Sequence, residues 1–484
     1  MSPSFSISAI ELYERPVRLR LPFRFGAATV TQAPQAFVRA RIRIETAART
    51  PVEATGAAAE LMIPKWFDKS PGRSNAENTD DLRRALVGAA AAYASHHRPS
   101  TAFDHCAEHY RAIIAAGAAR GLNALTACYG AALIDRALLD ALCGALDVSF
   151  AAAINSNLAG IDARLTPDLA GFDMDGFLRR LSARPVIAAR HTIGMLDPLD
   201  AGDEAQPVVD HLPATLEQVI ATYGNRYFKI KLGGNAQADL SRLVRIASVL
   251  DRLPWYAVTL DGNEQYETVA AIDDFWRRVG ATRALDRLAA VTLYLEQPLP
   301  RALTLDTDIA ALDSSLPFLI DESDATLDAF PLARRRGYRG VSSKSCKGFY
   351  KSLLNAARCA QANAFPGPRA FLSGEDLTAQ AGLSVQQDLA LVGLLGLTHV
   401  ERNGHHYVDG FAGQGAGAAE QQSFLAAHPG LYRGDNNNVR LAIRDGVIDL
   451  GSLAAPGFAS RAEPDWTSLT PLSAATPMAS APAT

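Results

Sequence analysis

Two lysines set two residues apart are the first residues in this chain whose types and spacing suggest chemistry. Lys229 and Lys231 lie in the short run Tyr-Phe-Lys-Ile-Lys-Leu-Gly, residues 227–233. On a β-strand, alternation places both ammonium groups on one face and the apolar side chains on the other. Two like charges side by side repel, which should depress the pKa of at least one of them. A partly neutral lysine can act as a base. Such a pair alone is more often part of a solvated strand, so the rest of the chain decides its meaning.

Acidic residues follow the next three apolar runs. Asp261, Glu296 and Asp321 each stand directly after such a run, and Lys344 follows the one after that. Three converging carboxylates repel one another, and a cation relieves that repulsion. Oxygen ligands without cysteine or histidine favour Mg²⁺ or Mn²⁺. The series therefore predicts a metal site with lysines on both sides of it.

A regular alternation of apolar runs and amphipathic helical stretches would position these residues. The runs lie at 186–193, 227–232, 257–260, 291–295, 318–320, 340–343, 370–372 and 397–400. Such alternation predicts parallel strands with helical crossovers. Eight strands over about 215 residues favour a closed (β/α) barrel, in which functional residues sit at the carboxyl ends of the strands. We therefore expect the lysines and carboxylates to meet at the barrel mouth.

The residues before the barrel predict a second, smaller unit. Alternation indicates strands within 5–46, and three- and four-residue apolar spacing indicates helices within 79–146, beginning with an N-cap at Thr79. A further strand is expected near 148–154. Two loops carry Phe25 and Trp66, large side chains that either pack in the core or line a substrate lid.

Composition narrows the classes of partner. The chain has 484 residues, a formal net charge of -4 and no basic stretch that stands out, which argues against nucleic acid. Its five cysteines include no Cys-x-x-Cys pair and indicate a reducing compartment. No apolar run reaches the length of a membrane span, and the N-terminus lacks the pattern of a secretory signal. We expect a cytoplasmic protein, with no membrane or nucleic-acid partner, that forms a homo-oligomer.

The ordered series of motifs resembles the enolase superfamily, of the mandelate racemase/muconate lactonizing enzyme type, and within it the muconate lactonizing enzyme subgroup. The matching pieces are Lys229-x-Lys231, Asp261-x-Asn263, Glu296-Gln-Pro298, Asp321-Glu-Ser323 and Lys344-x-x-Lys347-Gly348. Outside the predicted barrel, the segments 21–26, 134–140 and 444–448, with Pro456-Gly457, resemble parts of that family's capping domain and of the segment that returns to it. The resemblance runs from about residue 8 to 465.

The resemblance implies an α/β fold: a modified TIM barrel, (β/α)₇β, with an α+β N-terminal capping domain completed by the C-terminal segment. The expected parts are the capping domain (1–150), the barrel (151–405), the returning segment (406–465) and a disordered tail (466–484). A hairpin is expected within 440–450, turning at 444–446.

The resemblance also assigns roles. It makes Asp261, Glu296 and Asp321 the Mg²⁺ ligands. It makes Lys231 and Lys344 acid/base residues on opposite faces of a small-molecule carboxylate, with Lys229 tuning Lys231 by its charge. Asn263 and Glu322 would contact the metal ligands without binding the metal themselves.

The implied reaction is removal of the proton α to a carboxylate, through an enediolate. Lysines on both faces favour racemisation or epimerisation; cycloisomerisation of the muconate lactonizing type and dehydration of acid sugars are the alternatives. A non-catalytic carboxylate-binding protein is a remote alternative, which the intact lysine pair argues against.

Further polar residues follow the last two strands. Glu375 would orient a lysine or bind substrate, or else be an ordinary acid at a helix N-terminus. Glu401 would contact a polar group of the substrate. Adjacent His405 and His406 are either metal ligands or, as we expect, solvated loop residues. The two histidines within predicted strands, His191 and His399, are expected to be satisfied core residues.

Overall fold

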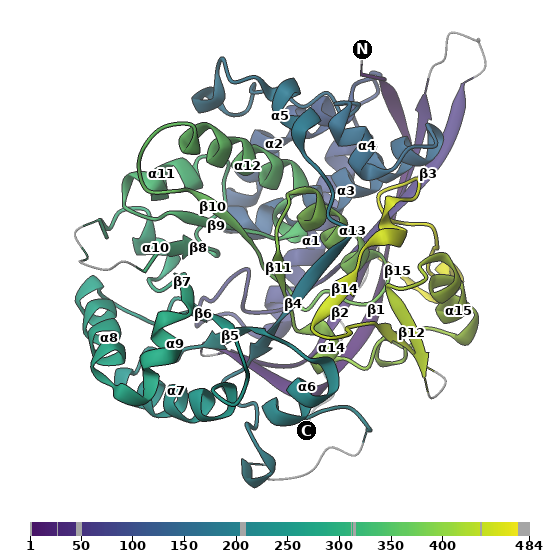
Figure 1. The fold of residues 1–484 in the computed structure, drawn as a ribbon. Helices are drawn as coiled ribbons and strands as arrows, with labels where there is room; N and C mark the ends of the chain where they lie inside the picture. The colour runs from purple at the N-terminus through teal and green to yellow at the C-terminus, as the bar shows by residue number, and fades with distance from the viewer. Residues whose placement is uncertain are drawn as a thin grey trace.

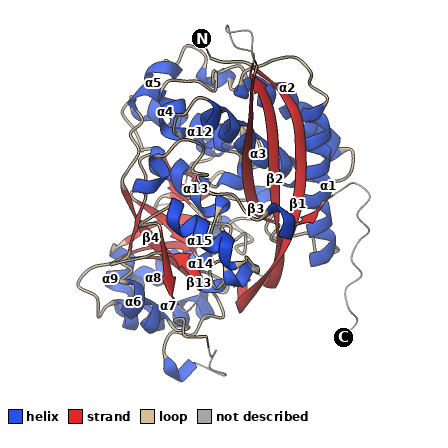
Figure 2. Ribbon diagram, turned by 90° about the vertical axis from the view of Figure 1, so that its right-hand side faces the viewer, coloured by secondary structure: helices blue, strands red, loops and turns tan. Residues whose placement is uncertain are grey.

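The computed structural model describes residues 2–26, 28–44, 51–203, 210–310, 312, 316–435 and 438–472. They form a closed barrel with an antiparallel sheet and its helices beside it, which we call the cap (Figure 1). Figure 2 shows the long strands of the cap sheet and the helices packed on them next to the barrel. Among the described residues, no helix combines the length and the apolar character needed to cross a membrane.

The cap sheet has the strand order β15-β1-β2-β3. Its strands are β1 (Phe5–Phe25), β2 (Ala28–Ile44), β3 (Val52–Leu61) and β15 (Thr470–Pro471). In β2 the apolar residues Val38, Ala40 and Ile42 are fully buried, as expected from their alternation with arginines. Gly56 lets helix α3 approach β3 closely, because a Cβ at this position would meet the backbone of α3 at 2.2 Å.

Helices cover one face of this sheet and continue toward the barrel. They are α1 (Asn75–Ala94), α2 (Ala102–Ala118), α3 (Ala124–Ala145), α4 (Phe150–Asn155) and α5 (Met174–Arg180). Helix α1 begins four residues before the predicted N-cap: Ser74 caps it, in a capping box with Glu77. The strand expected near 148–154 is also wrong, because Ser149 caps helix α4 there and Phe150 and Ile154 point into the core that cap and barrel share.

Eight parallel strands form the barrel. They are β4 (Val186–Ile193), β5 (Tyr227–Lys231), β6 (Ala257–Asp261), β7 (Thr292–Glu296), β8 (Phe318–Ile320), β9 (Gly340–Ser343), β10 (Phe371–Gly374) and β11 (His399–Arg402). Pairing of β11 with β4 closes the barrel. The predicted modified TIM barrel with an α+β cap is therefore confirmed, and the predicted strands match the observed ones to within a few residues.

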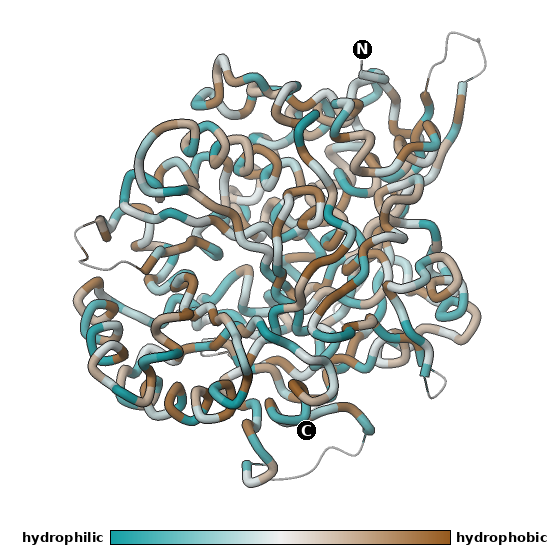
Figure 3. Tube along the Cα trace, in the orientation of Figure 1, coloured by the Kyte–Doolittle hydropathy of each residue, from teal (hydrophilic) through white to brown (hydrophobic). Residues whose placement is uncertain are grey.

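The barrel helices lie outside the strands. They are α6 (Leu216–Tyr223), α7 (Ala236–Leu250), α8 (Val269–Ala281), α9 (Asp286–Ala290), α10 (Arg301–Thr304), α11 (Ala329–Arg335), α12 (Phe349–Asn363) and α13 (Leu383–Leu394). In Figure 3, hydrophobic and hydrophilic residues alternate along the helices at the lower left, α7 and α8. Their buried residues, such as Leu243 and Phe275, pack against the outward-facing residues of the neighbouring strands, such as Phe228 and Ile230.

The C-terminal segment runs back from the barrel to the cap. It contains α14 (Gly404–Tyr407), α15 (Ala418–Ala427), β12 (Tyr432–Asp435), β13 (Asn438–Leu441) and β14 (Val447–Asp449). The hairpin expected within 440–450 is wrong in its partners: β13 pairs with β12, and β14 pairs antiparallel with barrel strand β4. At the start of the expected tail, residues 466–472 carry a 3₁₀ turn and the strand β15, which pairs with β1. The rest of that tail, 473–484, lies outside the described residues.

Candidate functional site

The polar residues selected from the sequence stand together at the carboxyl ends of the barrel strands. Lys231, Asp261 and Glu296 end β5, β6 and β7 and are direct partners in the register of the sheet. Asp321 follows β8 and Lys344 follows β9. In an eight-stranded barrel β5 and β9 lie opposite each other, so the two lysines face one another across three strands that end in carboxylates.

Lys229 lies at the centre of this group and is fully buried. Its Nζ contacts four carboxylates: Asp261 at 3.0 Å, Glu296 at 2.8 Å, Glu375 at 2.8 Å and Glu401 at 2.9 Å. Burial opposes the charge, but the four carboxylates outweigh it and raise the pKa of Lys229 well above its ordinary value. A depressed pKa was expected for at least one of the two lysines, and Lys229 is not that lysine, because four acids that the sequence did not place beside it surround it.

The two outer lysines each hold a different carboxylate. Lys231 Nζ lies 2.6 Å from Asp261 Oδ2, and Lys344 Nζ lies 2.6 Å from Asp321 Oδ2. Burial acts to lower the pKa of Lys344, but Asp321 outweighs it and the pKa is raised. Lys347, one turn further on, also reaches Asp321, at 3.4 Å. Both lysines are thus held as donors to the acids nearest them.

The three carboxylates of β6, β7 and β8 differ in their electrostatic environment. Burial, together with repulsion from Asp261 and Glu375, raises the pKa of Glu296 well above its ordinary value. Burial acts in the same direction on Asp261 and Asp321, but the lysines beside them hold both pKa values below the ordinary range. Glu296 is therefore the member of the series that most lacks positive charge.

The donor set suits a hard divalent cation. It consists of buried carboxylate oxygens on adjacent strand ends, with no thiolate or imidazole among them, which matches Mg²⁺. The lysines supply the positive charge that balances these carboxylates. In the described part of the chain, no three His, Cys, Asp or Glu side chains are grouped closely enough to hold a metal ion as they stand. The residue types thus fit a Mg²⁺ ion that would compete with ammonium groups for the same oxygens.

A loop of the cap covers the lysine on β9. The ring of Trp66 lies over Lys344, with its centre 4.3 Å from Nζ, a cation–π contact. Three residues further on, Lys69 donates to Glu322 Oε1 at 2.8 Å and pairs with Glu264 at 2.7 Å. Phe25 is the last residue of strand β1, not in a loop as predicted, and it is buried and packs on Phe23. Trp66 therefore both packs and contacts a site residue, whereas Phe25 packs in the core.

The supporting residues named from the sequence lie directly behind the first group. Asn263 donates to Glu322 Oε1 at 3.3 Å, and its backbone N–H donates to Asp261 at 2.9 Å. Glu375 is not at a helix N-terminus; it follows β10 and accepts from Tyr294 at 2.8 Å as well as from Lys229. Glu401 accepts from Thr192 at 2.6 Å. All four side chains named in this way are buried.

The sequence analysis missed two neighbours of the site, and its expectations for the histidines held only in part. Arg190 is fully buried within β4 and forms an ion pair with Glu375. Its position as a single arginine in an apolar strand could have indicated a buried acidic partner. Nothing in the sequence indicated that Lys69 pairs with Glu264 and Glu322, because these contacts depend on how its loop packs against the barrel. His406 is buried within the short helix α14, not solvated as expected. His191 lies in the core as expected, but its Nδ1 has no hydrogen bond among the described residues, so it is not satisfied. His399 is half-buried, and its Nδ1 lies 2.6 Å from Arg190 Nη1.

Comparison with other proteins gives a clear result for the fold. No family model and no curated protein matches the sequence, but solved structures match over nearly its full length. Muconate lactonizing enzyme from Mycobacterium smegmatis, complexed with muconolactone, has a TM-score of 0.57 at 17% identity, over 96% of this chain and 98% of its own. An enolase from Bradyrhizobium, complexed with magnesium and mandelic acid, has a TM-score of 0.55 at 16% identity, over 93% and 96%. L-Ala-D/L-Glu epimerase from Bacillus subtilis has a TM-score of 0.54 at 14% identity, over 94% and 98%. The chain therefore has the same fold as these proteins, a barrel with a cap.

Proposed function

We propose that this protein is a Mg²⁺-dependent enzyme that removes the proton α to a carboxylate and returns it, as a racemase or epimerase. The observation that carries the proposal is the pair Lys231 and Lys344 on opposite strands, with Asp261, Glu296 and Asp321 on the strands between them. The solved structures with this fold include an epimerase and a magnesium complex of an enolase, which supports the proposal.

The three carboxylates would hold the metal. A bound Mg²⁺ supplies positive charge that stabilises the negative charge developing on the substrate carboxylate as the α-proton leaves. The chain's own residues do the rest. One outer lysine, whose carboxylate partner would then be engaged by the metal, takes the proton on its face of the substrate, and the other gives a proton on the opposite face. Trp66 with its loop closes the mouth against water.

Cycloisomerisation is the second candidate, because a muconate lactonizing enzyme is among the solved structures with this fold. In that reaction one lysine transfers a proton and the other remains a cation that stabilises charge. The two candidates differ in what each lysine does, so the same variants separate them.

The test is hydrogen–deuterium exchange at the α-carbon, followed by NMR in D₂O over a panel of carboxylates with Mg²⁺. A racemase exchanges the α-proton of both enantiomers. Lys231→Ala should abolish exchange from one enantiomer and Lys344→Ala from the other, while Lys→Arg at each site restores charge but not proton transfer. Loss of exchange from both enantiomers in either variant indicates the one-base reaction. No exchange with any carboxylate, together with saturable binding of one, would support a binding protein and contradict an enzyme.

A further inference from the structure

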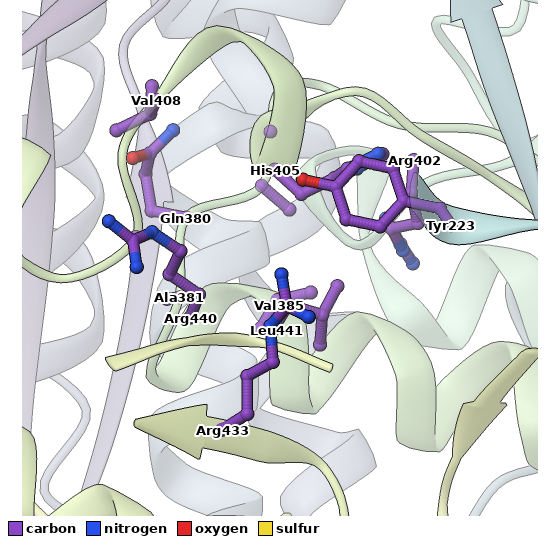
Figure 4. Close-up of a pocket in the computed structure, with 13 residues that line it drawn as sticks. Tyr223, Gln380, Ala381, Val385, Arg402, His405, Val408, Arg433, Arg440 and Leu441 are labelled. Carbon is purple, nitrogen blue, oxygen red and sulfur yellow. The ribbon is translucent and has the colours of Figure 1, made fainter. Parts of the chain in front are cut away.

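A second polar pocket lies outside the barrel, between strand β11 and the C-terminal segment. Figure 4 shows it. Its walls come from the end of α6, the residues after β10, the start of α14, and strands β12 and β13. None of the carboxylates or lysines of the barrel mouth lines it. It is therefore a separate place at which a ligand could bind.

Three arginines and no carboxylate line this pocket: Arg402, Arg433 and Arg440. We call it the arginine pocket. Two of the three arginines form close ion pairs with acids that do not line the pocket. Arg402 is held by Asp376, at 2.9 Å, and by Asp388, while Arg440 is held by Asp409 and Asp435. These pairs fix the two guanidinium groups in place and leave the cavity itself lined by positive charge.

Arg433 differs from the other two. Its guanidinium makes no hydrogen bond within the described part of the chain, and its ion contact is a long one, 3.7 Å from Nε to Asp435 Oδ2. Its Cζ lies 5.9 Å from the centre of the Tyr223 ring. In Figure 4 the guanidinium points up into the pocket, and the Tyr223 hydroxyl points toward the same space. A planar set of N–H donors is thus aimed at the cavity, and it has no hydrogen-bond acceptor among the described residues.

Other buried polar atoms of the pocket also lack partners. They are both ring nitrogens of His405, Nε of Arg402 and Oε1 of Gln380, each without a hydrogen bond among the described residues. Burial and neighbouring positive charge hold the pKa of His405 well below its ordinary value, so its neutral ring offers one donor and one acceptor. Buried groups of this kind cost stability unless something binds them.

We propose that the arginine pocket binds a small phosphate-type oxyanion. Arg433, Tyr223 and His405 supply donors for its oxygens, and Gln380 Oε1 supplies an acceptor for a protonated oxygen. Guanidinium groups match the oxygen spacing of phosphate, and hydrogen phosphate carries both the acceptors and the donor that this set requires. A carboxylate offers no such donor at neutral pH, so it satisfies fewer of these groups.

Arg433 is the residue to change in a test. Arg402 also holds the acids beside the barrel mouth, because Asp376 donates its backbone N–H to Glu401 at 2.9 Å, so its loss would disturb both sites. Arg433 has no such second task. Arg444, an exposed arginine on the turn after β13 that does not line the pocket, is the matched control.

The experiment is isothermal titration of the full chain with inorganic phosphate and, separately, with phosphoserine, at constant ionic strength, with acetate as the carboxylate comparison. We expect saturable binding of at least one phosphate compound, weakened about tenfold or more in Arg433→Gln, less in Arg433→Lys, and unchanged in Arg444→Gln. Preference for inorganic phosphate identifies the free ion as ligand; preference for phosphoserine identifies the phosphate group of a larger molecule.

Any of three results would overturn the proposal. One is a lack of saturable binding of either compound up to about 20 mM, which corresponds to only a few kcal/mol of binding free energy. Another is equal affinity in the wild type and in a folded Arg433→Gln protein, with folding checked by circular dichroism. Tighter binding of acetate than of phosphate would also contradict it, because the donor and acceptor set would then not select a phosphate.

Discussion

At the scale of single residues, the carboxylates of the barrel mouth are neutralised by lysines, which a bound metal would partly replace. Lys229 neutralises four carboxylates at once, and the outer lysines each hold one. A divalent cation at Asp261, Glu296 and Asp321 would supply charge that these ammonium groups now provide. This makes Lys229 the residue at which metal binding can be tested without a substrate.

Lys229→Met should lower the free energy of unfolding by about 3–5 kcal/mol, the usual cost of leaving buried charges without a partner. Added Mg²⁺ should then raise the thermal midpoint of the variant more than that of the wild type, because its carboxylates lack a cation. Thermal unfolding with and without Mg²⁺ measures both effects, and Ca²⁺-free EDTA buffer gives the reference. Equal Mg²⁺ shifts in the two proteins would contradict the metal site.

Asp135, in helix α3 of the cap, predicts a pH dependence of stability away from the barrel mouth. Burial raises the pKa of its carboxyl to about 7, while Tyr93 and Cys106 donate to it and oppose the shift. The folded state thus holds a proton that the unfolded state has released above pH ~4. Stability from this group is present below pH 4 and is lost as pH rises to 7.

Asp135→Asn should remove that loss. At pH 8 the variant should be more stable than wild type by up to ~4 kcal/mol, the free energy that corresponds to a pKa raised from about 4 to about 7. At pH 4 the two proteins should have nearly equal stability. Urea unfolding at the two pH values checks this. Asp147→Asn, an exposed change near the end of the same helix, should leave the slope unaltered. A parallel slope in Asp135→Asn and wild type would show that Asp135 does not carry it.

At the scale of elements, the loop after β3 fastens the cap to the barrel mouth. Trp66 lies on Lys344, and Lys69 bridges Glu322 and Glu264. Arg301, at the start of α10, donates to the backbone oxygens of Trp66 and Phe67 at 2.8 Å. The loop is therefore held by charges at the barrel, although it belongs to the cap in sequence.

Lys69→Met should loosen this loop, because two buried acids lose their bridge. Chymotrypsin cleavage near Trp66 and Phe67 should become several-fold faster, and KM for a substrate should rise more than kcat falls. Lys69→Arg should restore most of the protection. If cleavage is equally slow in Lys69→Met and wild type, the bridge does not hold the loop.

Features that depend on residues close together in the sequence could be predicted, whereas features that depend on residues far apart in the sequence were missed. Strand ends and their acids could be predicted, because a strand and the residue after it are local and the barrel brings them together. The environment of Lys229 could not be predicted, because Glu375 and Glu401 are 146 and 172 residues away in the chain. The placement of β14 on β4 failed for the same reason: a turn at 444–446 does not show which strand it pairs with.

At the scale of the whole molecule, one aromatic cluster joins distant parts of the chain. Phe458, in the returning segment, stacks on Phe150 of α4 with ring centres 3.8 Å apart, and lies 5.4 Å from Phe349 of barrel helix α12. Close by, Asp140 of α3 accepts from the backbone N–H of Phe458 at 2.6 Å. Cap, barrel and C-terminal segment thus share one packed core.

Phe458→Ala should therefore destabilise the protein by about 3–5 kcal/mol, the range for a buried Phe truncated to Ala, while Phe458→Leu should cost less. Urea unfolding followed by both fluorescence and circular dichroism measures the loss. A single coincident transition in both variants is expected, because the cluster couples the parts. Separate transitions for cap and barrel in wild type would contradict that coupling.

The pairing of β15 with β1 also governs how the chain acquires its structure during synthesis. Tyr13 of β1 pairs with Pro471 of β15. The first strand to be synthesised therefore has one unpaired edge until almost the last described residues have been made. Until the ribosome releases them, that strand edge and the docking face for Phe458 stay open to other chains. Nascent chains stalled before residue 450 should thus engage chaperones, and refolding of the full chain should be slow because its closing contacts span more than 450 residues.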